Sequence, residues 1–189
     1  DAALDTWTRT LEAPRHELQV LYTTKGYIHG AVSFLNPDTM ETVFCNADPK
    51  NGTSIPAMVP NEIQAEVDAV FVLEKETAFR RLLDEGFVEH VFGGKAVVLT
   101  GCGYPDLPTR MFLHKLARTV PTIPVYGITD ADPHGLEIMG VYAFGSKSQA
   151  HAVDSLSVPR MQWLGIDIED IENLGLPEKV KIPLSQSDI

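Results

Sequence analysis

The chain has 189 residues, of which 44% are hydrophobic and 22% charged, as is usual for one globular domain of fair size. Its formal net charge is −11, which argues against a generic nucleic-acid-binding protein, although basic residues can still gather on one face. No apolar run approaches the roughly 18 residues of a membrane span, so we expect no membrane contact. The two cysteines, Cys45 and Cys102, lack metal-type spacing and indicate buried free thiols in a reducing compartment.

The first sixty residues are predicted to be mostly β-structure. The pattern from residue 18 to 35 is typical of a hairpin with a turn at Lys25-Gly26, and short apolar pieces follow it. The predicted strands are 18–22, 27–34, 42–45 and 55–59, after a short helix that ends at Pro14. We therefore expect residues 1–67 to form a β-rich flank packed on the domain that follows.

From residue 68 the pattern changes to alternating strands and helices. Three continuous apolar runs are typical of strands buried on both faces, and helical apolar spacing follows each of them. The predicted strands are 69–73, 96–99 and 123–128, and the predicted helices are 76–84, 107–120 and 135–143. This βαβαβα order predicts an α/β domain over residues 68–189, with a parallel sheet covered by helices. In such sheets the functional residues collect at the carboxyl ends of the strands.

Carboxylates follow two of these predicted strands. Asp130 and Asp132 come after the third strand, and strand alternation points both side chains the same way. No Lys or Arg is near them in sequence to balance their charges. Their spacing is equally consistent with a site for a divalent cation such as Mg²⁺ and with a solvated acidic turn. Glu74 follows the first strand and faces the aspartate pair if the two strands are neighbours. Three carboxylates at one place favour a bound metal ion over the alternative, an ion pair of Glu74 with Lys75 or Arg81.

A basic stripe runs along the predicted helix 107–120. Arg110, His114 and Arg118 recur every four residues opposite the apolar face, and Lys115 lies beside them. A solvated face is the usual interpretation of such a stripe. Because the stripe starts at the edge that holds the carboxylates, Arg110 is also a candidate contact for a phosphodiester backbone.

Three sequence blocks resemble a known family. They are VLEKETAFRRLLD (72–84), LTGCGYPDLPTR (99–110) and DADPHGLEIM (130–139), and the later pieces 141–146, 158–165 and 182–185 also fit. In this order they resemble the Toprim domain of the topoisomerase VI A-subunit family, which includes the meiotic recombination proteins of the Spo-eleven type. The Toprim pattern is a Glu after the first strand and a D-x-D after the third. The resemblance extends from about residue 18 to the end of the chain.

The resemblance implies a topoisomerase-like (type IIB) transesterase that makes meiotic double-strand breaks in nuclear DNA. A tyrosine attacks a phosphodiester and stays attached to the 5′ end, while a Toprim-bound Mg²⁺ organises the phosphates. The carboxylates implied to hold Mg²⁺ are Glu74, Asp130 and Asp132. The residues implied to contact double-stranded DNA are Lys75, Tyr104 and Arg110. The implied partners are a second copy of the parent protein, whose tyrosine works against this metal site, and an accessory topoisomerase VI B-like subunit.

The chain departs from the family pattern in two ways. Relatives commonly carry Lys where this chain has Cys102. In the family, the nucleophilic tyrosine lies in a winged-helix domain that precedes the Toprim domain, and the residues before Leu18 are too few to form one. We therefore expect a part of a longer protein that binds metal and DNA but does not cleave. The alternatives are a non-catalytic Toprim-shaped module for dimerisation or partner docking, and a phosphoryl-transfer enzyme with a nucleophilic aspartate, which the late position of the D-x-D disfavours.

Overall fold

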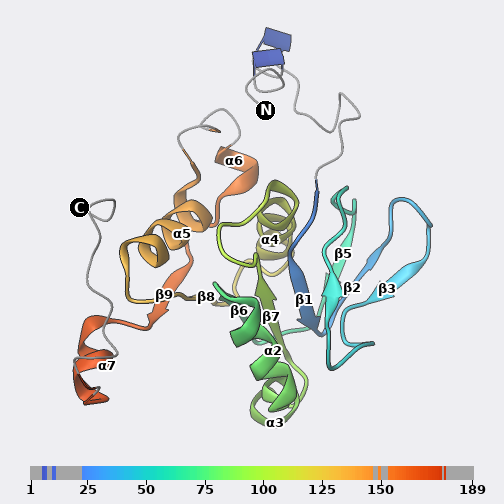
Figure 1. The fold of residues 1–189 in the computed structure, drawn as a ribbon. Coiled ribbons are helices and arrows are strands. Elements are labelled where there is room, and N and C mark those ends of the chain that lie inside the picture. Colours follow the sequence, from blue (N-terminus) through green and yellow to red (C-terminus); the bar gives the residue numbers. More distant parts are fainter. Residues whose placement is uncertain are drawn as a thin grey trace.

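A six-stranded sheet in the order β4-β1-β7-β6-β8-β9 forms the centre of the protein (Figure 1). The structure is a computed structural model that describes residues 6, 7, 10, 11, 23–146, 149, 153–175 and 177. The strands of this sheet are β1 (Tyr27–Gly30), β4 (Thr53–Ser54), β6 (Ala69–Leu73), β7 (Ala96–Thr100), β8 (Val125–Ile128) and β9 (Gln162–Gly165). The last four are parallel to one another, and β1 and β4 add an antiparallel edge. The predicted α/β class with a mostly parallel, helix-covered sheet is confirmed.

Strand β6 lies between β7 and β8, so the first and third predicted strands are neighbours. Leu73, the last residue of β6, pairs with Thr100 on one side and Ile128 on the other. All five residues of β6 and of β7 are buried, as expected for strands that helices cover on both faces. The carboxyl ends of the three strands therefore meet at one edge of the sheet.

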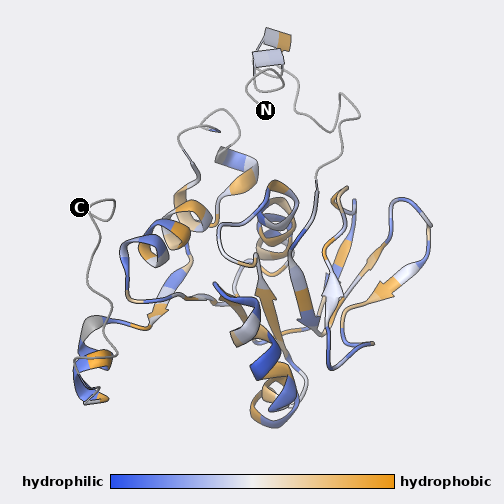
Figure 2. Ribbon diagram, in the orientation of Figure 1, coloured by the Kyte–Doolittle hydropathy of each residue, from blue (hydrophilic) through white to orange (hydrophobic). Residues whose placement is uncertain are grey.

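Helices pack on both faces of the sheet and create two hydrophobic cores. Helices α2 (Glu76–Asp84) and α3 (Phe87–Phe92) close one core around Phe71 and Phe79. Helices α4 (Leu107–Thr119) and α5 (Pro133–Phe144) close the other around Leu113 and Tyr142. Hydrophobic residues are accordingly concentrated in the central strands and on the inner sides of the helices (Figure 2). The shorter helices are α6 (Val153–Leu156), which contacts α4, and α7 (Ile168–Asn173).

A second, antiparallel sheet of three strands lies beside the main sheet. It has the order β3-β2-β5, with β2 (Val32–Leu35), β3 (Thr42–Phe44) and β5 (Ile63–Ala65). The chain passes from one sheet to the other at Gly30, where φ is +134° and a Cβ atom would lie 2.1 Å from the carbonyl oxygen of Ala96. Only glycine fits this close approach.

The predictions for the first sixty residues are confirmed only in part. The strand predicted over 27–34 is divided between the two sheets, and its predicted partner at 18–22 lies outside the described residues. The strand predicted at 42–45 is confirmed as β3, whereas the one at 55–59 is wrong. Residues 6, 7, 10 and 11 are helical, but the predicted helix end at Pro14 lies outside the described residues. Within the described part of the chain, no helix has the length and apolar character to span a membrane.

Candidate metal and DNA site

The side chain of Glu74 contacts the backbone of the aspartate loop that follows the neighbouring strand. Glu74 directly follows β6, and its Oε2 accepts a hydrogen bond from the backbone N–H of Asp130 at 2.9 Å. The backbone N–H of Glu74 in turn donates to the carbonyl oxygen of Ile128 at 3.0 Å. Asp132 lies two residues further on and caps α5, because its Oδ1 accepts from the backbone N–H of Gly135 at 2.7 Å. The fold thus gathers all three predicted carboxylates at one edge.

The ammonium of Lys75 lies among these carboxylates. Its Nζ donates to Oδ2 of Asp130, and this bond is the main reason that the pKa of Lys75 is raised, with smaller contributions from the charges of Asp130, Glu74 and Asp132. No Lys or Arg is near the aspartate pair in sequence, but the pairing of β6 with β8 brings Lys75 to Asp130. Part of the carboxylate repulsion is therefore relieved by the protein itself.

The donor chemistry of this edge fits Mg²⁺, although no ready-made cluster is present. Three carboxylates supply hard oxygen ligands, and the hydrogen bonds above use one oxygen of each of them. Among the described residues, however, no group of three His, Cys, Asp or Glu side chains is placed so that it could hold a metal ion. Mg²⁺ binding by Glu74, Asp130 and Asp132 stays a prediction, and it requires these side chains to reorient.

Tyr104 projects from the loop before α4 toward the start of α5. Its hydroxyl donates to Oε2 of Glu137 and lies 3.0 Å from Nδ1 of His134. The bond to Glu137 is the largest cause that raises the pKa of Tyr104 to about 12. The phenol therefore loses its proton less readily than a free tyrosine does, while 41% of the residue remains exposed.

His134 and Glu137 were not predicted from the sequence as functional residues. Their spacing of three residues places both on one face of α5, directly after the D-x-D. That spacing, next to the predicted metal ligands, is the sequence feature that could have indicated these two residues as functional.

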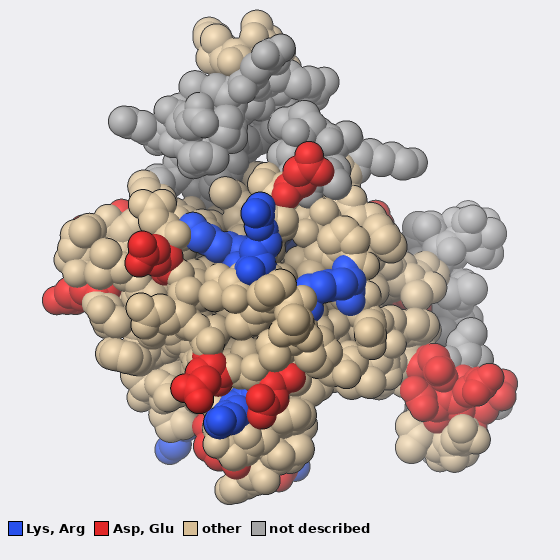
Figure 3. All heavy atoms as spheres, turned by 180° about the vertical axis from the view of Figure 1, so that it is seen from behind, with Lys and Arg blue, Asp and Glu red and all other residues tan. Residues whose placement is uncertain are grey.

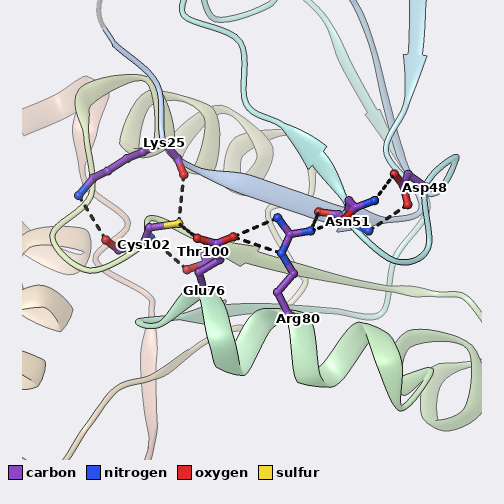
Figure 4. Close-up of polar contacts among 7 residues, drawn as sticks. All are labelled: Lys25, Asp48, Asn51, Glu76, Arg80, Thr100 and Cys102. Atoms are coloured by element: carbon purple, nitrogen blue, oxygen red, sulfur yellow. Dashed lines mark hydrogen bonds and ion pairs between the residues drawn. The ribbon is translucent and has the colours of Figure 1, made fainter.

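A second lysine reaches the same edge from the β-rich flank. Lys25 is exposed, and its Nζ donates to the carbonyl oxygen of Cys102 at 3.3 Å (Figure 4). The backbone N–H of Lys25 donates to Oδ2 of Asp106 at 2.8 Å, and the Cys102 thiol donates to the carbonyl oxygen of Lys25 at 3.1 Å. Cys102 is only half-buried, contrary to prediction, and is in the left-handed region at φ 54°. Lys25 thus brings an ammonium to the loop that contains Cys102.

Arg80 links α2 to the β-rich flank. Its guanidinium pairs with Glu76 at 3.0 Å and donates to the carbonyl and side-chain oxygens of Asn51 at 2.8 and 3.0 Å (Figure 4). It also lies over the ring of Tyr27, 4.9 Å from the centroid. Asp48 orients Asn51 through hydrogen bonds, and these bonds lower the pKa of the Asp48 carboxyl. Because its charge and its donors are already used, Arg80 has a structural role here.

Arg110 does not lie on the surface of α4. Only 3% of it is exposed, and its Nη1 donates to Oε1 of Gln149 at 2.6 Å. Burial lowers the pKa of its guanidinium. The basic stripe of the sequence is therefore not one solvated face: Arg110 is buried, His114 is half-buried and only Arg118 is exposed. A contact of Arg110 with DNA stays a prediction that requires the side chain to leave this position.

The sheet topology and the clustered carboxylates define the class as a Toprim-type α/β domain. Residues 69–189 match the Toprim domain of the topoisomerase 6 A-subunit/Spo11 family. The matched segment covers more than half of the chain. The chain belongs to this family, which confirms the resemblance noted in the sequence.

Curated relatives are similar over the whole chain. The meiotic recombination protein SPO11 of Mus musculus is 37% identical over 191 residues, which cover 100% of this chain and 47% of the relative. SPO11-1 of Oryza sativa subsp. indica is 35% identical over 190 residues, covering 100% and 48%, and the DNA topoisomerase 6 A-subunit of Arabidopsis thaliana is 32% identical over 191 residues, covering 100% and 43%. The chain thus spans somewhat less than half the length of these relatives.

Proposed function

We propose that this chain is the Mg²⁺-binding and DNA-contacting part of a type IIB topoisomerase-like transesterase that makes meiotic double-strand breaks in nuclear DNA. The observation that carries the proposal is that Asp130 bonds to the ammonium of Lys75 while the charges of Glu74 and Asp132 also raise its pKa, at the edge where α/β sheets hold their chemistry. The family and the names of its relatives supply the substrate class and the process.

Glu74, Asp130 and Asp132 are the residues that would hold Mg²⁺. When bound, the ion supplies positive charge that stabilises a phosphodiester during transesterification. Lys75 bonds to Asp130, which is also one of these proposed ligands. If Asp130 held the ion instead, the ammonium of Lys75 would be available to a DNA phosphate. We infer that Lys75 balances the carboxylates in the free protein and contacts the backbone in the complex.

Double-stranded DNA is the proposed ligand of this edge. Lys25 and Lys75 are exposed cations there, and the exposed ring of Tyr104 offers a flat surface with its hydroxyl fixed by Glu137. In the family pattern the attacking tyrosine belongs to a winged-helix domain, and we propose that this holds for the parent protein and that Tyr104 is not the nucleophile. The parent would act as a homodimer with a topoisomerase VI B-like subunit, and this chain by itself would not cleave.

A non-catalytic Toprim-shaped module for dimerisation or partner docking is the second candidate. The observation that favours it is the bond of Lys75 to Asp130, which offsets carboxylate charge without a metal. The two candidates differ in what magnesium does to the folded chain.

Thermal unfolding in a magnesium titration separates these candidates. A site that binds only the folded chain raises the melting temperature progressively with Mg²⁺ concentration at constant ionic strength. We expect this rise in the wild type and in a Glu66→Ala control, whose carboxylate lies outside the site, but not in Glu74→Ala or Asp132→Ala. Equal responses of the wild type and both site variants would remove the metal from the proposal and leave the non-catalytic module.

A further inference from the structure

A second hollow lies on the outer side of α4, away from the sheet. It has a volume of about 630 Å³ and is enclosed by α4, α6, the segment between β4 and β5, and the turn after β2. Its lining residues are Pro37, Ala57, Met58, Val59, Asn61, Met111, His114, Lys115, Arg118, Thr119, Asp154 and Ser155. The proposed metal and DNA site contains none of these residues.

The cavity extends along the outer face of α4 from Met111 to Thr119, and its two cations lie in the second half of the helix, whereas the carboxylate edge adjoins the start of the helix. The helix starts at its N-cap Asp106, beside the loop that Lys25 contacts. Arg118 lies twelve residues further along, about 18 Å along the helix axis. The cavity therefore faces a different part of the surface from the one proposed to hold DNA.

Two cations of the cavity have no acidic partner among the described residues. Neither Lys115 nor Arg118 lies within 4.0 Å of a carboxylate oxygen in the described part of the chain, and Asp154 is the one carboxylate among the lining residues. By contrast, four other described cations are paired with carboxylates: Lys75, Arg80, Arg81 and Lys95. From behind the view of Figure 1, Lys and Arg side chains gather across the upper middle of the face, and Asp and Glu side chains lie above them, below them and at both sides (Figure 3).

The rest of the lining is largely apolar and adaptable. Met58 and Met111 lie on the cavity together with Ala57 and Val59, and Met58 is 42% exposed. Methionine side chains adapt readily to an incoming apolar group, and an exposed one on a concave surface is typical of a binding site. His114 is held in place because its Nδ1 lies 2.7 Å from the carbonyl oxygen of Ser157.

We propose that this cavity docks an acidic segment of a partner protein, in which an apolar side chain is flanked by Asp or Glu. The apolar side chain would fill the space beside Met58 and Met111, and the carboxylates would meet Lys115 and Arg118. A DNA duplex supplies the negative charge but presents no apolar side chain to the methionines. The chain carries a net charge of −11, so two cations without a carboxylate partner beside apolar side chains favour an acidic ligand at this cavity. The proposal needs neither Mg²⁺ nor DNA and so goes beyond the proposed function.

Fluorescence anisotropy with a defined peptide tests this proposal on the full chain. The probe is a fluorescein-labelled peptide that carries a Phe-Leu pair between two runs of Glu. The comparison probes have Lys in place of every Glu, or Gly in place of Phe-Leu, and a short labelled DNA duplex is the third. Among the peptides, we expect only the first to bind. Its affinity should fall as the salt concentration rises, and it should fall about tenfold or more in the double variant Lys115→Glu with Arg118→Glu.

The control carries Lys50→Glu and Lys95→Glu, a reversal of equal charge outside the cavity, and we expect it to bind the peptide as the wild type does. Met58→Ala is expected to weaken binding several-fold without a change in charge. Circular dichroism checks folding, and Lys115→Gln with Arg118→Gln replaces the reversal if that variant unfolds. The proposal is overturned if the folded wild type does not bind the peptide, if the Lys peptide binds equally, or if both double variants bind alike. A DNA site at the cavity would also overturn it. In that case the duplex would displace the peptide, and its affinity would fall in Lys115→Glu with Arg118→Glu but not in Lys75→Ala.

Discussion

The carboxylate of Glu74 accepts a hydrogen bond from the backbone N–H of Asp130 at 2.9 Å, and this bond joins the ends of two neighbouring parallel strands. Glu74 is therefore oriented by the backbone of the aspartate loop. Lys75, the next residue, bonds to the side chain of the same aspartate. Of the two residues that follow β6, Glu74 thus contacts the backbone of Asp130 and Lys75 contacts its carboxylate.

Lys75 is expected to compete with magnesium for Asp130. Removal of its ammonium in Lys75→Met leaves the carboxylate charge uncompensated, so Mg²⁺ should bind more tightly. An exposed ion pair contributes about 0.2–1 kcal/mol, which corresponds to an increase in Mg²⁺ affinity of up to about fivefold. The midpoint of the Mg²⁺-dependent rise in melting temperature measures this change. An unchanged or weaker midpoint would show that Lys75 and the ion do not share a ligand.

Lys25 and Lys75 are both expected to contact the DNA backbone. Each phosphate contact releases counterions, so Lys25→Ala and Lys75→Ala should each weaken duplex binding and reduce the slope of log affinity against log salt by about one. Anisotropy with a labelled duplex over a salt series measures both quantities. Lys95→Ala is the matched control, because Lys95 pairs with Glu66 outside the site. A slope that changes as much in the control as in Lys25→Ala would contradict the assignment of Lys25.

The phenol of Tyr104 is expected to resist deprotonation. Its hydrogen bond to Glu137 and the nearby negative charge raise its pKa from 10.0 to about 12. The difference in phenolate absorbance between the wild type and Tyr104→Phe, followed against pH, isolates this residue from the other four tyrosines. In Glu137→Gln we expect the transition to move back toward 10. A transition near 10 in the wild type would mean that Glu137 does not hold the phenol in solution.

The chain is expected to lose stability in alkali in part through Cys45. This residue is fully buried, and burial raises the pKa of its thiol from 9.0 to about 12. The folded state then holds a proton that the unfolded state releases, so the free energy of unfolding falls as pH rises from about 9 toward 12, at up to about 1.4 kcal/mol per pH unit. Denaturant unfolding across this range should show a shallower loss in Cys45→Val than in the wild type. Parallel losses would exclude the thiol as the cause.

Local patterns in the sequence predict the central elements closely. The strand at 69–73 and the helix at 76–84 have the predicted bounds, because continuous apolar runs and helical spacing are properties of the local sequence. The short helix 87–92 and the strand 162–165 were not predicted. The helix lies between two glycines in the left-handed region, and the strand has three exposed residues out of four and exists through its pairing with β8.

The sequence by itself determined the carboxylates that follow β6 and β8, the α/β class and the family. These depend on residue type and order along the chain. Only the tertiary structure decided where the two lysines lie: Lys75 bonds to the carboxylate of Asp130, 55 residues away, and Lys25 bonds to the carbonyl oxygen of Cys102, 77 residues away. The buried Arg110 likewise donates to Gln149, 39 residues away, and helical periodicity cannot predict this partner. Hydrogen bonds and burial depend on distance in space, and strand pairing sets that distance between residues remote in sequence.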